Sequence, residues 1–284
     1  MVKVFVDSGS SIKQEEKEKL GVEILPLKIM LDEKEYLDGV DLSIDEFYDA
    51  LINKNLFPKT SLPSLADAED KVNECTKNGD DVIILTISSG ISGTYNTFKM
   101  LFADNEKVRV IDSKCAVGGI RLLVHEINKY REESLDFIEE KVNALIPRIK
   151  IIAIPETLDY LHRGGRLSKT AKIAGNLMHL KPLIGIDTIS GQVKMFSKSI
   201  GIKRAMLTLA EYLEKNECDQ NYMIVPSYTY NKENLDKLIE LTDDKYKKIM
   251  DEYDNLDPAI ACHWGPNAFG YIFVRNNKKE QYFT

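Results

Sequence analysis

Short apolar runs alternate with longer amphipathic stretches along the first half of the chain. Strand-sized apolar runs lie at residues 3–6, 22–30, 82–86 and 108–111. Residues 43–53 place apolar side chains at helical spacing, and residues 64–77 begin with a serine that can cap a helix. Strands that alternate with helices form a mostly parallel sheet joined by right-handed crossovers. The pattern therefore predicts an N-terminal three-layer α/β domain over residues 1–150.

The pattern changes near residue 150, where strands begin to follow one another more directly. Apolar runs predict strands at residues 151–154, 183–187, 192–197, 222–225, 258–262 and 271–274. A serine–glycine turn between the second and third of these runs indicates a β-hairpin. Helices are expected at residues 157–161, 168–180, 203–215 and 232–241. We therefore expect a C-terminal α+β domain with an antiparallel sheet over residues 151–284. Because no low-complexity linker separates the two domains, they should pack closely.

The composition is that of a folded chain. Hydrophobic residues make up 43% of the 284 positions and charged residues 29%, which provides for a large core and excludes a disordered or collagen-like chain. The net charge of -7 disfavours a protein that coats nucleic acid or anionic lipid, because neutralising phosphate needs a basic face. No apolar run reaches the roughly 18 residues of a membrane-spanning helix. Because the N-terminus runs directly into a predicted strand, without a long apolar stretch and a small-residue cleavage site, we expect no signal peptide.

Residues that hold metals and cofactors do not occur at the required spacings. The four cysteines stand far apart without a Cys-x-x-Cys pair, so we expect reduced thiols in a cytoplasmic protein. His125, His162 and His179 have no Asp, Glu or Cys companion at metal-ligand spacing. No G-x-G-x-x-G follows the first strand, and no G-x-x-x-x-G-K-[ST] is present. We therefore expect neither a metal nor a cofactor.

The densest group of hydroxyl and glycine residues is ISSGISGTY, residues 87–95. It follows a predicted strand and precedes an apolar stretch that predicts a helix. Free backbone N–H groups and the helix dipole suit such a loop to a carboxylate or a phosphate. Ser92 adds a hydroxyl donor, although an ordinary serine cap accounts for one serine here. The segment GISGT lacks the last glycine of G-x-S-x-G, so it is not the nucleophile elbow of a hydrolase.

Three further loops carry polar side chains that can face a ligand. Thr60 and Ser61 precede Ser64, which we expect to cap a helix, and they are equally consistent with plain loop hydroxyls and with ligand donors. His263 follows a predicted strand, and its ring either completes the donors around a carboxylate or packs in the core. Arg166 follows two glycines that break a helix, and it either binds a carboxylate ligand or pairs with a nearby Asp.

Taken together, these segments resemble the DegV family of bacterial fatty-acid-binding proteins. The matching segments keep the family's order over almost the whole chain: Asp7-Ser8-Gly9-Ser10, Pro26-Leu27, Thr60-Ser61-x-Pro63-Ser64, Ser88-Ser89-Gly90-x-Ser92-Gly93-Thr94-Tyr95, Ile111-Asp112-Ser113, Leu158-x-Tyr160-Leu161-x-x-Gly164-Gly165-Arg166-x-Ser168, Lys181-Pro182 and His263-x-Gly265-Pro266. The resemblance implies an α/β and an α+β domain with a long-chain fatty acid bound between them. It also implies an apolar tunnel for the acyl tail and a set of loop groups that hold the carboxylate: Thr60, Ser61, Ser92, Gly93 and His263, with Arg166 nearby.

The resemblance further implies a protein partner. Such proteins present the fatty acid to a separate ATP-dependent fatty acid kinase, which forms an acyl phosphate for phospholipid synthesis. Residues 155–210 carry nine basic and three acidic side chains, a surplus that either forms a solvated face or docks an acidic partner. On the docking interpretation, the basic stretch around Lys198, Lys203 and Arg204 contacts the kinase.

Three positions depart from the family pattern. Leu62 stands where Gln is common, Asn96 where Gln is usual and Asn267 where Gly is usual. Leu62 and Asn267 lie beside the expected headgroup site, so acyl preference or headgroup geometry can differ from that of relatives.

Two other classes of function stay open alongside the carrier. A serine-dependent acyl hydrolase would use Ser92 and His263. A structural or regulatory binding module would carry no lipid. Because no pairing of a nucleophile with a base is evident, we expect a lipid carrier or kinase accessory subunit without catalysis of its own.

Overall fold

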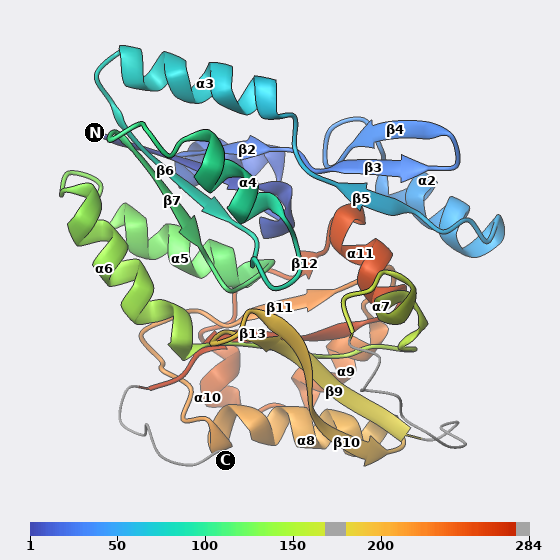
Figure 1. Cartoon of the computed structure of the whole chain (residues 1–284). Helices are drawn as coiled ribbons and strands as arrows, with labels where there is room; N and C mark the ends of the chain where they lie inside the picture. Colours follow the sequence, from blue (N-terminus) through green and yellow to red (C-terminus); the bar gives the residue numbers. More distant parts are fainter. Residues whose placement is uncertain (168–179, 277–284) are drawn as a thin grey trace.

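The computed structural model describes residues 1–167 and 180–276, and its first half is built on a parallel sheet, sheet A (Figure 1). The strand order is β2-β1-β6-β7, with β1 at Val2–Asp7, β2 at Val22–Leu25, β6 at Asp81–Thr86 and β7 at Val108–Asp112. Two helices pack on each face: α3 (Leu65–Lys77) and α4 (Thr94–Leu101) on one, α5 (Gly118–Asn128) and α6 (Leu135–Leu145) on the other. The predicted three-layer α/β arrangement is confirmed.

The second half is built on a six-stranded sheet, sheet C. The strand order is β10-β9-β8-β13-β11-β12, with β8 at Ile149–Ile154, β9 at Leu180–Asp187, β10 at Gln192–Ile200, β11 at Val225–Tyr228, β12 at Asp254–Asn255 and β13 at Phe269–Val274. Neighbouring strands are antiparallel except β11 and β12. One face is covered by α8 (Ile202–Lys215), α9 (Glu233–Glu240) and α10 (Asp244–Lys247). The predicted hairpin and the antiparallel α+β character are confirmed.

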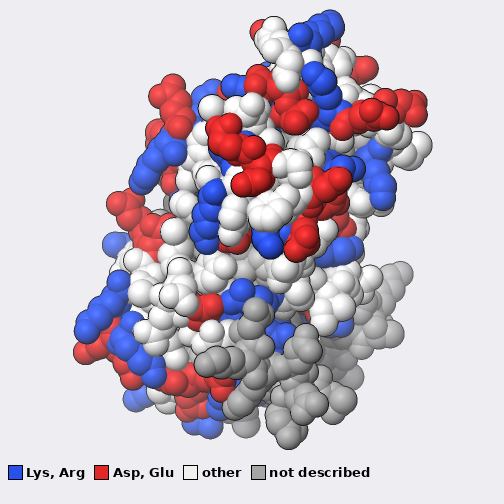
Figure 2. Space-filling model, turned by 90° about the vertical axis from the view of Figure 1, so that its left-hand side faces the viewer, with Lys and Arg blue, Asp and Glu red and all other residues white. Residues whose placement is uncertain are grey.

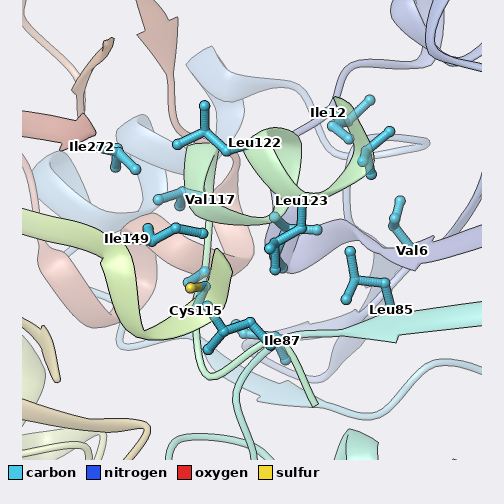
Figure 3. Packing of buried hydrophobic residues seen from close by; sticks show 14 of the residues in the cluster. Val6, Ile12, Leu85, Ile87, Cys115, Val117, Leu122, Leu123, Ile149 and Ile272 are labelled. Atoms are coloured by element: carbon cyan, nitrogen blue, oxygen red, sulfur yellow. The ribbon is translucent and has the colours of Figure 1, made fainter. Parts of the chain in front are cut away.

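Helix α5 lies between the two sheets, and both pack on it. Figure 3 shows Val6 and Leu85 of sheet A on one side of α5, and Ile149 and Ile272 of sheet C on the other. All four side chains belong to one buried hydrophobic cluster. Because this cluster contains residues from both halves of the chain, the division into domains at residue 150 stays a prediction.

A third, small sheet brings a loop of the first half to a helix of the second. Its order is β4-β3-β5, with β3 at Lys28–Leu31, β4 at Lys34–Leu37 and β5 at Lys59–Ser61. Its buried residues pack with those of α2 (Ile44–Tyr48), the π-helical turn η3 (Asp49–Asn53) and α11 (Pro258–Trp264). The remaining short elements are η1 (Ser8–Ser10), η2 (Gln14–Glu16), α1 (Lys17–Leu20), η4 (Ile146–Arg148) and α7 (Asp159–Arg163).

Two strand predictions are wrong. The strand expected at residues 258–262 is the helix α11, because Pro258 occupies the first helical position, where a missing N–H and a fixed φ are tolerated. An apolar run this short has no period that separates a strand from a buried helix. The strand expected at residues 22–30 is two strands, β2 and β3, which are interrupted at Pro26 because proline cannot donate to a sheet.

Smaller differences concern boundaries. The strand expected at residues 222–225 begins at Val225 and runs to Tyr228. The helix expected at residues 157–161 begins two residues later, at Asp159. The helix expected at residues 168–180 lies outside the described residues except for Leu180, which begins β9.

In the part of the chain that the structure describes, no helix is long and apolar enough to cross a membrane. On the face shown in Figure 2, acidic and basic side chains are interspersed over the described surface. This mixture agrees with the argument from net charge against a protein that coats nucleic acid.

Candidate functional site

The loop between β6 and α4 is fixed by carboxylates on the two neighbouring strands. Asp7, at the end of β1, accepts a hydrogen bond from the backbone N–H of Ile87 at 2.7 Å. Asp112, at the end of β7, accepts one from the N–H of Ser89 at 3.0 Å and pairs with the Lys114 ammonium at 2.7 Å. Burial raises the pKa of Asp7 to about 7, against the opposing effect of its backbone hydrogen bonds. The carboxyl ends of three parallel strands therefore set the path of this loop.

The same loop contacts the hairpin turn of sheet C. The Ser88 hydroxyl donates to the carbonyl oxygen of Gly191 at 2.8 Å. Gly191 has a φ of +74°, and a Cβ there would overlap the Ser88 Oγ. Glycine is required at this turn both for its backbone conformation and for the close approach. The contact holds the β9–β10 hairpin against the loop that carries Ser92.

Strand β5 and helix α11 bring a threonine and a histidine together. Thr60 lies on β5, His263 lies in the last turn of α11, and Thr60 Oγ1 is 3.0 Å from His263 Nε2. The first turn of α11 is bound from the N-terminal half: Asp38 accepts from the Ala259 N–H at 3.0 Å. In addition, Lys13 Nζ lies 2.5 Å from the carboxylate of Asp257. These contacts fix the helix and hence the position of His263.

The His263 ring is half-buried and, at neutral pH, uncharged. Burial, with a smaller effect from the charge of Arg166, lowers the pKa of His263 to about 4. Its Nδ1 atom is buried and has no hydrogen-bond partner among the described residues. A Cβ at Gly164 would overlap this atom, so the glycine lets α7 approach the ring. A neutral imidazole offers one N–H donor and one acceptor to its surroundings.

Arg166 connects two loops at the edge of the site. Its Nε donates to the carbonyl oxygen of Ile91 at 3.1 Å, and its Nη1 donates to that of Gly164 at 2.5 Å. The sequence left open whether Arg166 binds a carboxylate ligand or pairs with a neighbouring Asp. In the structure these two hydrogen bonds of Arg166 go to backbone carbonyl oxygens, which neither alternative described. Arg166 therefore brings a positive charge to the site while it ties the 87–93 loop to the end of α7.

All six predicted headgroup residues line one cavity. The cavity has a volume of about 230 Å³, and its lining includes Thr60, Ser61, Ser92, Gly93, Arg166 and His263. The rest of the described lining is apolar: Leu27, Leu62, Ile87, Ile91, Ala116, Leu161, Ile186, Val193, Ala259, Ile260 and Trp264. A second cavity of about 30 Å³ shares Ala116, Ile186 and Trp264 with the first and continues over sheet C. A space with polar groups on one side and an apolar continuation suits an amphipathic ligand.

Three larger hollows lie elsewhere. They have volumes of about 440, 500 and 750 Å³, and the lining of each carries several charged side chains. None of the six predicted residues lines any of the three, as far as the described chain goes. Their charged walls do not suit an acyl chain, whereas most of the residues that line the smaller cavity are apolar.

The apolar members of the site were not found from the sequence. Ile186 lies near the end of a strand and Trp264 at the end of a helix, in sequence segments that look like those of ordinary core residues. What distinguishes them is that both line the two cavities, which only the structure shows. The sequence feature that could have indicated a space above the strands is the presence of small residues on sheet C, such as Gly270 and Ala153.

The structure gives no support to the hydrolase alternative. The Ser92 hydroxyl bonds to that of Thr94 at 2.8 Å, whereas the His263 ring bonds to Thr60. Among the hydrogen bonds of the described residues, none joins Ser92 to His263 or His263 to a carboxylate, as a hydrolase triad requires. Residues 1–167 and 180–276 also contain no cluster of His, Cys, Asp and Glu that could hold a metal.

The three predicted docking residues lie apart from this cavity. Lys198 is on β10, and Lys203 and Arg204 are on the first turn of α8. All three side chains are exposed. Their role in docking stays a prediction.

Comparison with known proteins agrees with the fold and the cavity. A family model described as an uncharacterised protein of the DegV family matches residues 1–276. A DegV domain-containing protein of Clostridium acetobutylicum is 30% identical over 279 residues, which cover 96% of this chain and 99% of that protein. A stearic acid-binding protein of Eubacterium ventriosum is 28% identical, and its structure has a TM-score of 0.84 over 97% of this chain and 98% of its own. A fatty acid binding DegV family protein of Streptococcus agalactiae is 26% identical, with a TM-score of 0.84 over 98% and 99% of the two chains.

Proposed function

Because the chain belongs to the DegV family, we propose that it binds a long-chain fatty acid in the cavity between the 87–93 loop, β5 and α11. One observation carries the proposal: hydroxyl groups and an arginine gather on one side of a cavity whose remaining walls are apolar. The solved relatives described as stearic acid-binding and fatty acid binding support it.

The two parts of the cavity match the two parts of the ligand. Burying the acyl chain is favourable by about 0.8 kcal/mol per CH₂, and the apolar walls receive it. A carboxylate removed from water needs hydrogen-bond donors to replace its hydration. With His263 neutral and protonated on Nε2, the ring donates to Thr60 Oγ1 and leaves the threonine hydroxyl free to donate to the carboxylate. The charge of Arg166 favours the anion further.

We propose further that the bound carboxylate is presented in the cytoplasm to a separate ATP-dependent fatty acid kinase, which forms the acyl phosphate. The exposed side chains of Lys198, Lys203 and Arg204 support a docking surface for an acidic partner. The four cysteines are free, in agreement with a reducing compartment. Chemistry by the chain itself is not part of the proposal.

Titration of the delipidated protein with stearic acid tests the binding function. Thr60→Val keeps the shape of the side chain and removes its hydroxyl, so we expect about a 10-fold weaker affinity, the size of one lost hydrogen bond. Thr97→Val is the matched control, because its hydroxyl bonds to the Gly93 carbonyl on the exposed side of α4. Equal affinity of Thr60→Val and the parent would contradict the role of Thr60, and no binding by the parent would contradict the function.

Charge reversal tests the docking part separately. A variant with Lys198, Lys203 and Arg204 all changed to Glu should bind stearic acid as the parent does, because none of the three lines the described cavity. With a fatty acid kinase and ATP, this variant should form acyl phosphate at least 10-fold more slowly than the parent at limiting carrier concentration. Equal rates would remove these residues from the interface.

A further inference from the structure

The second cavity runs along the face of sheet C, away from the headgroup residues. It shares Ala116, Ile186 and Trp264 with the larger cavity, so the two cavities adjoin one another. Where it crosses the sheet, Ala153 of β8 and Gly270 of β13 are register partners. Small side chains at both positions leave room above the strands. An acyl tail that fills the first cavity therefore continues here.

One polar side chain interrupts this apolar lining. Ser227 lies on β11 opposite Gly270 of β13, and it is 5% exposed. Its hydroxyl oxygen is buried and has no hydrogen-bond partner among the described residues. The other described side chains of the lining are hydrocarbon, apart from the Trp264 indole and Tyr271, whose hydroxyl bonds to Thr242. Ser227 therefore presents an unpaired donor and acceptor to an apolar chamber.

A second polar side chain lies on the neighbouring strand. Asp254 on β12 is the register partner of Ser227 in the parallel β11–β12 pair, so both side chains point to the same face. Asp254 is 5% exposed, and neither of its carboxyl oxygens has a hydrogen-bond partner within the described chain. Asp254 thus lies next to Ser227 in the sheet but outside the described lining of the cavity.

An unpaired hydroxyl in this position disfavours a plain hydrocarbon tail. Leaving a buried donor unsatisfied costs free energy, which contact with CH₂ groups does not recover. A tail that carries a hydroxyl or keto oxygen can bond to Ser227, which both donates and accepts.

We propose that Ser227 gives this chain a preference for fatty acids that carry a hydroxyl or keto group on the distal part of the acyl chain. The proposal rests on the proposed fatty acid function and names the substrate class of that site. From Ile186 on β9 to Ser227 on β11 the sheet order passes through β8 and β13. Three strand spacings of about 4.8 Å each amount to about 14 Å. The recognised oxygen therefore lies in the half of a long chain that is remote from the carboxylate.

Titration of the delipidated full-length protein with a matched set of ligands tests the preference. The set contains stearic acid, hydroxystearic acids that differ in the position of the hydroxyl group, and the corresponding oxostearic acids. We expect a distal hydroxy acid to bind about 10-fold more tightly than stearic acid, whereas acids with the hydroxyl near the carboxylate bind no better than stearic acid. Ser227→Ala should abolish this preference while it leaves stearic acid affinity equal or stronger.

A second serine provides the matched control. Ser199 on β10 is also buried, but its hydroxyl lies 3.3 Å from that of Thr208, and it lines neither cavity in the described structure. Ser199→Ala should keep the parent's ratio of affinities. If the parent binds every isomer as it binds stearic acid, or if Ser227→Ala keeps the parent's ratio, the proposal is overturned while fatty acid binding stands. If the parent binds none of the acids, the proposed function itself fails.

Discussion

His263 contributes to the site as an uncharged residue. Burial lowers its pKa to about 4, so at neutral pH the positive charge near the cavity comes from Arg166. The motif that contains His263 pointed to a residue that lines the cavity, and its role beside a headgroup stays a prediction. Its contact with Gly164 was beyond the reach of the sequence, because it depends on how the end of α7 meets α11. The local sequence motif thus indicated that His263 lies at the cavity. Its protonation state and its contacts depend on tertiary packing, which the motif does not contain.

A buried carboxyl should make stability depend on pH. Burial raises the pKa of Asp254 from 3.8 to about 7 in the folded chain. The folded state therefore holds a proton that the unfolded state releases between these two values, and this contribution to stability is lost as pH rises through 7. Asp254→Asn stays neutral throughout, so its stability relative to the parent should increase between pH 4 and pH 7 and then level off.

Urea denaturation of both proteins across this pH range is the measurement. Asp136→Asn is the control, because it removes a carboxylate whose side chain is 86% exposed. A constant difference between the parent and Asp254→Asn at all pH values would contradict the buried, proton-holding carboxyl.

Helix α11 shows what an element-scale prediction can miss. Its apolar residues pack on both the small sheet and the main core, so no polar face reveals a helical period. The signal that was present is Asp257 followed by Pro258, a common start of a helix. By contrast, the alternation of β1, β6 and β7 with helices is regular enough to predict the parallel sheet. The regularly alternating strands and helices were predictable, and the short apolar helix without a visible period was not.

The attachment of α11 to the N-terminal half should matter for ligand binding. Asp38 accepts from the Ser8 hydroxyl at 2.6 Å and from the Ala259 N–H in the first turn of α11. Asp38→Ala leaves both donors unpaired in a buried place, so we expect a loss of about 1–3 kcal/mol in the free energy of unfolding. Amide hydrogen exchange over residues 258–264 should become faster, and stearic acid affinity should fall because His263 is less well fixed.

The exposed pair of Asp136 and Arg109 again supplies the control. Asp136→Ala removes a surface ion pair, which is worth about 0–1 kcal/mol, and should leave exchange in α11 unchanged. If Asp38→Ala slows or preserves exchange over residues 258–264, the attachment does not order the helix.

At the scale of the whole molecule, the site exists only because distant parts of the chain converge. The 87–93 loop, β5 and the end of α11 line one cavity, and sheet C continues its apolar wall. The family resemblance predicted which loops meet. It did not reveal the contact of Ser88 with Gly191, because the sequence contains no local trace of a hairpin turn that packs on a loop about a hundred residues away.

The contact between loop and hairpin can be tested with two glycines that share a positive φ. Gly191 and Gly201 have φ values of +74° and +78°, and of these two only Gly191 would bring a Cβ against neighbouring atoms. Both changes to Ala strain the backbone, at a cost of about 1–3 kcal/mol. Gly191→Ala should in addition displace the Ser88 loop and weaken stearic acid binding, which Gly201→Ala should not. Equal affinities of the two variants would show that this contact does not support the site.

The most direct test of the central claim is mass spectrometry of the protein as purified, first native and then after denaturation and lipid extraction. A fatty acid carrier should show close to one fatty acid per chain in the native spectrum, and extraction should release the same acid. Ser92→Ala and Thr60→Val should carry less of it, while Thr97→Val should match the parent. A protein that carries no lipid and takes up none when fatty acid is added would contradict the account and leave only the fold and the family.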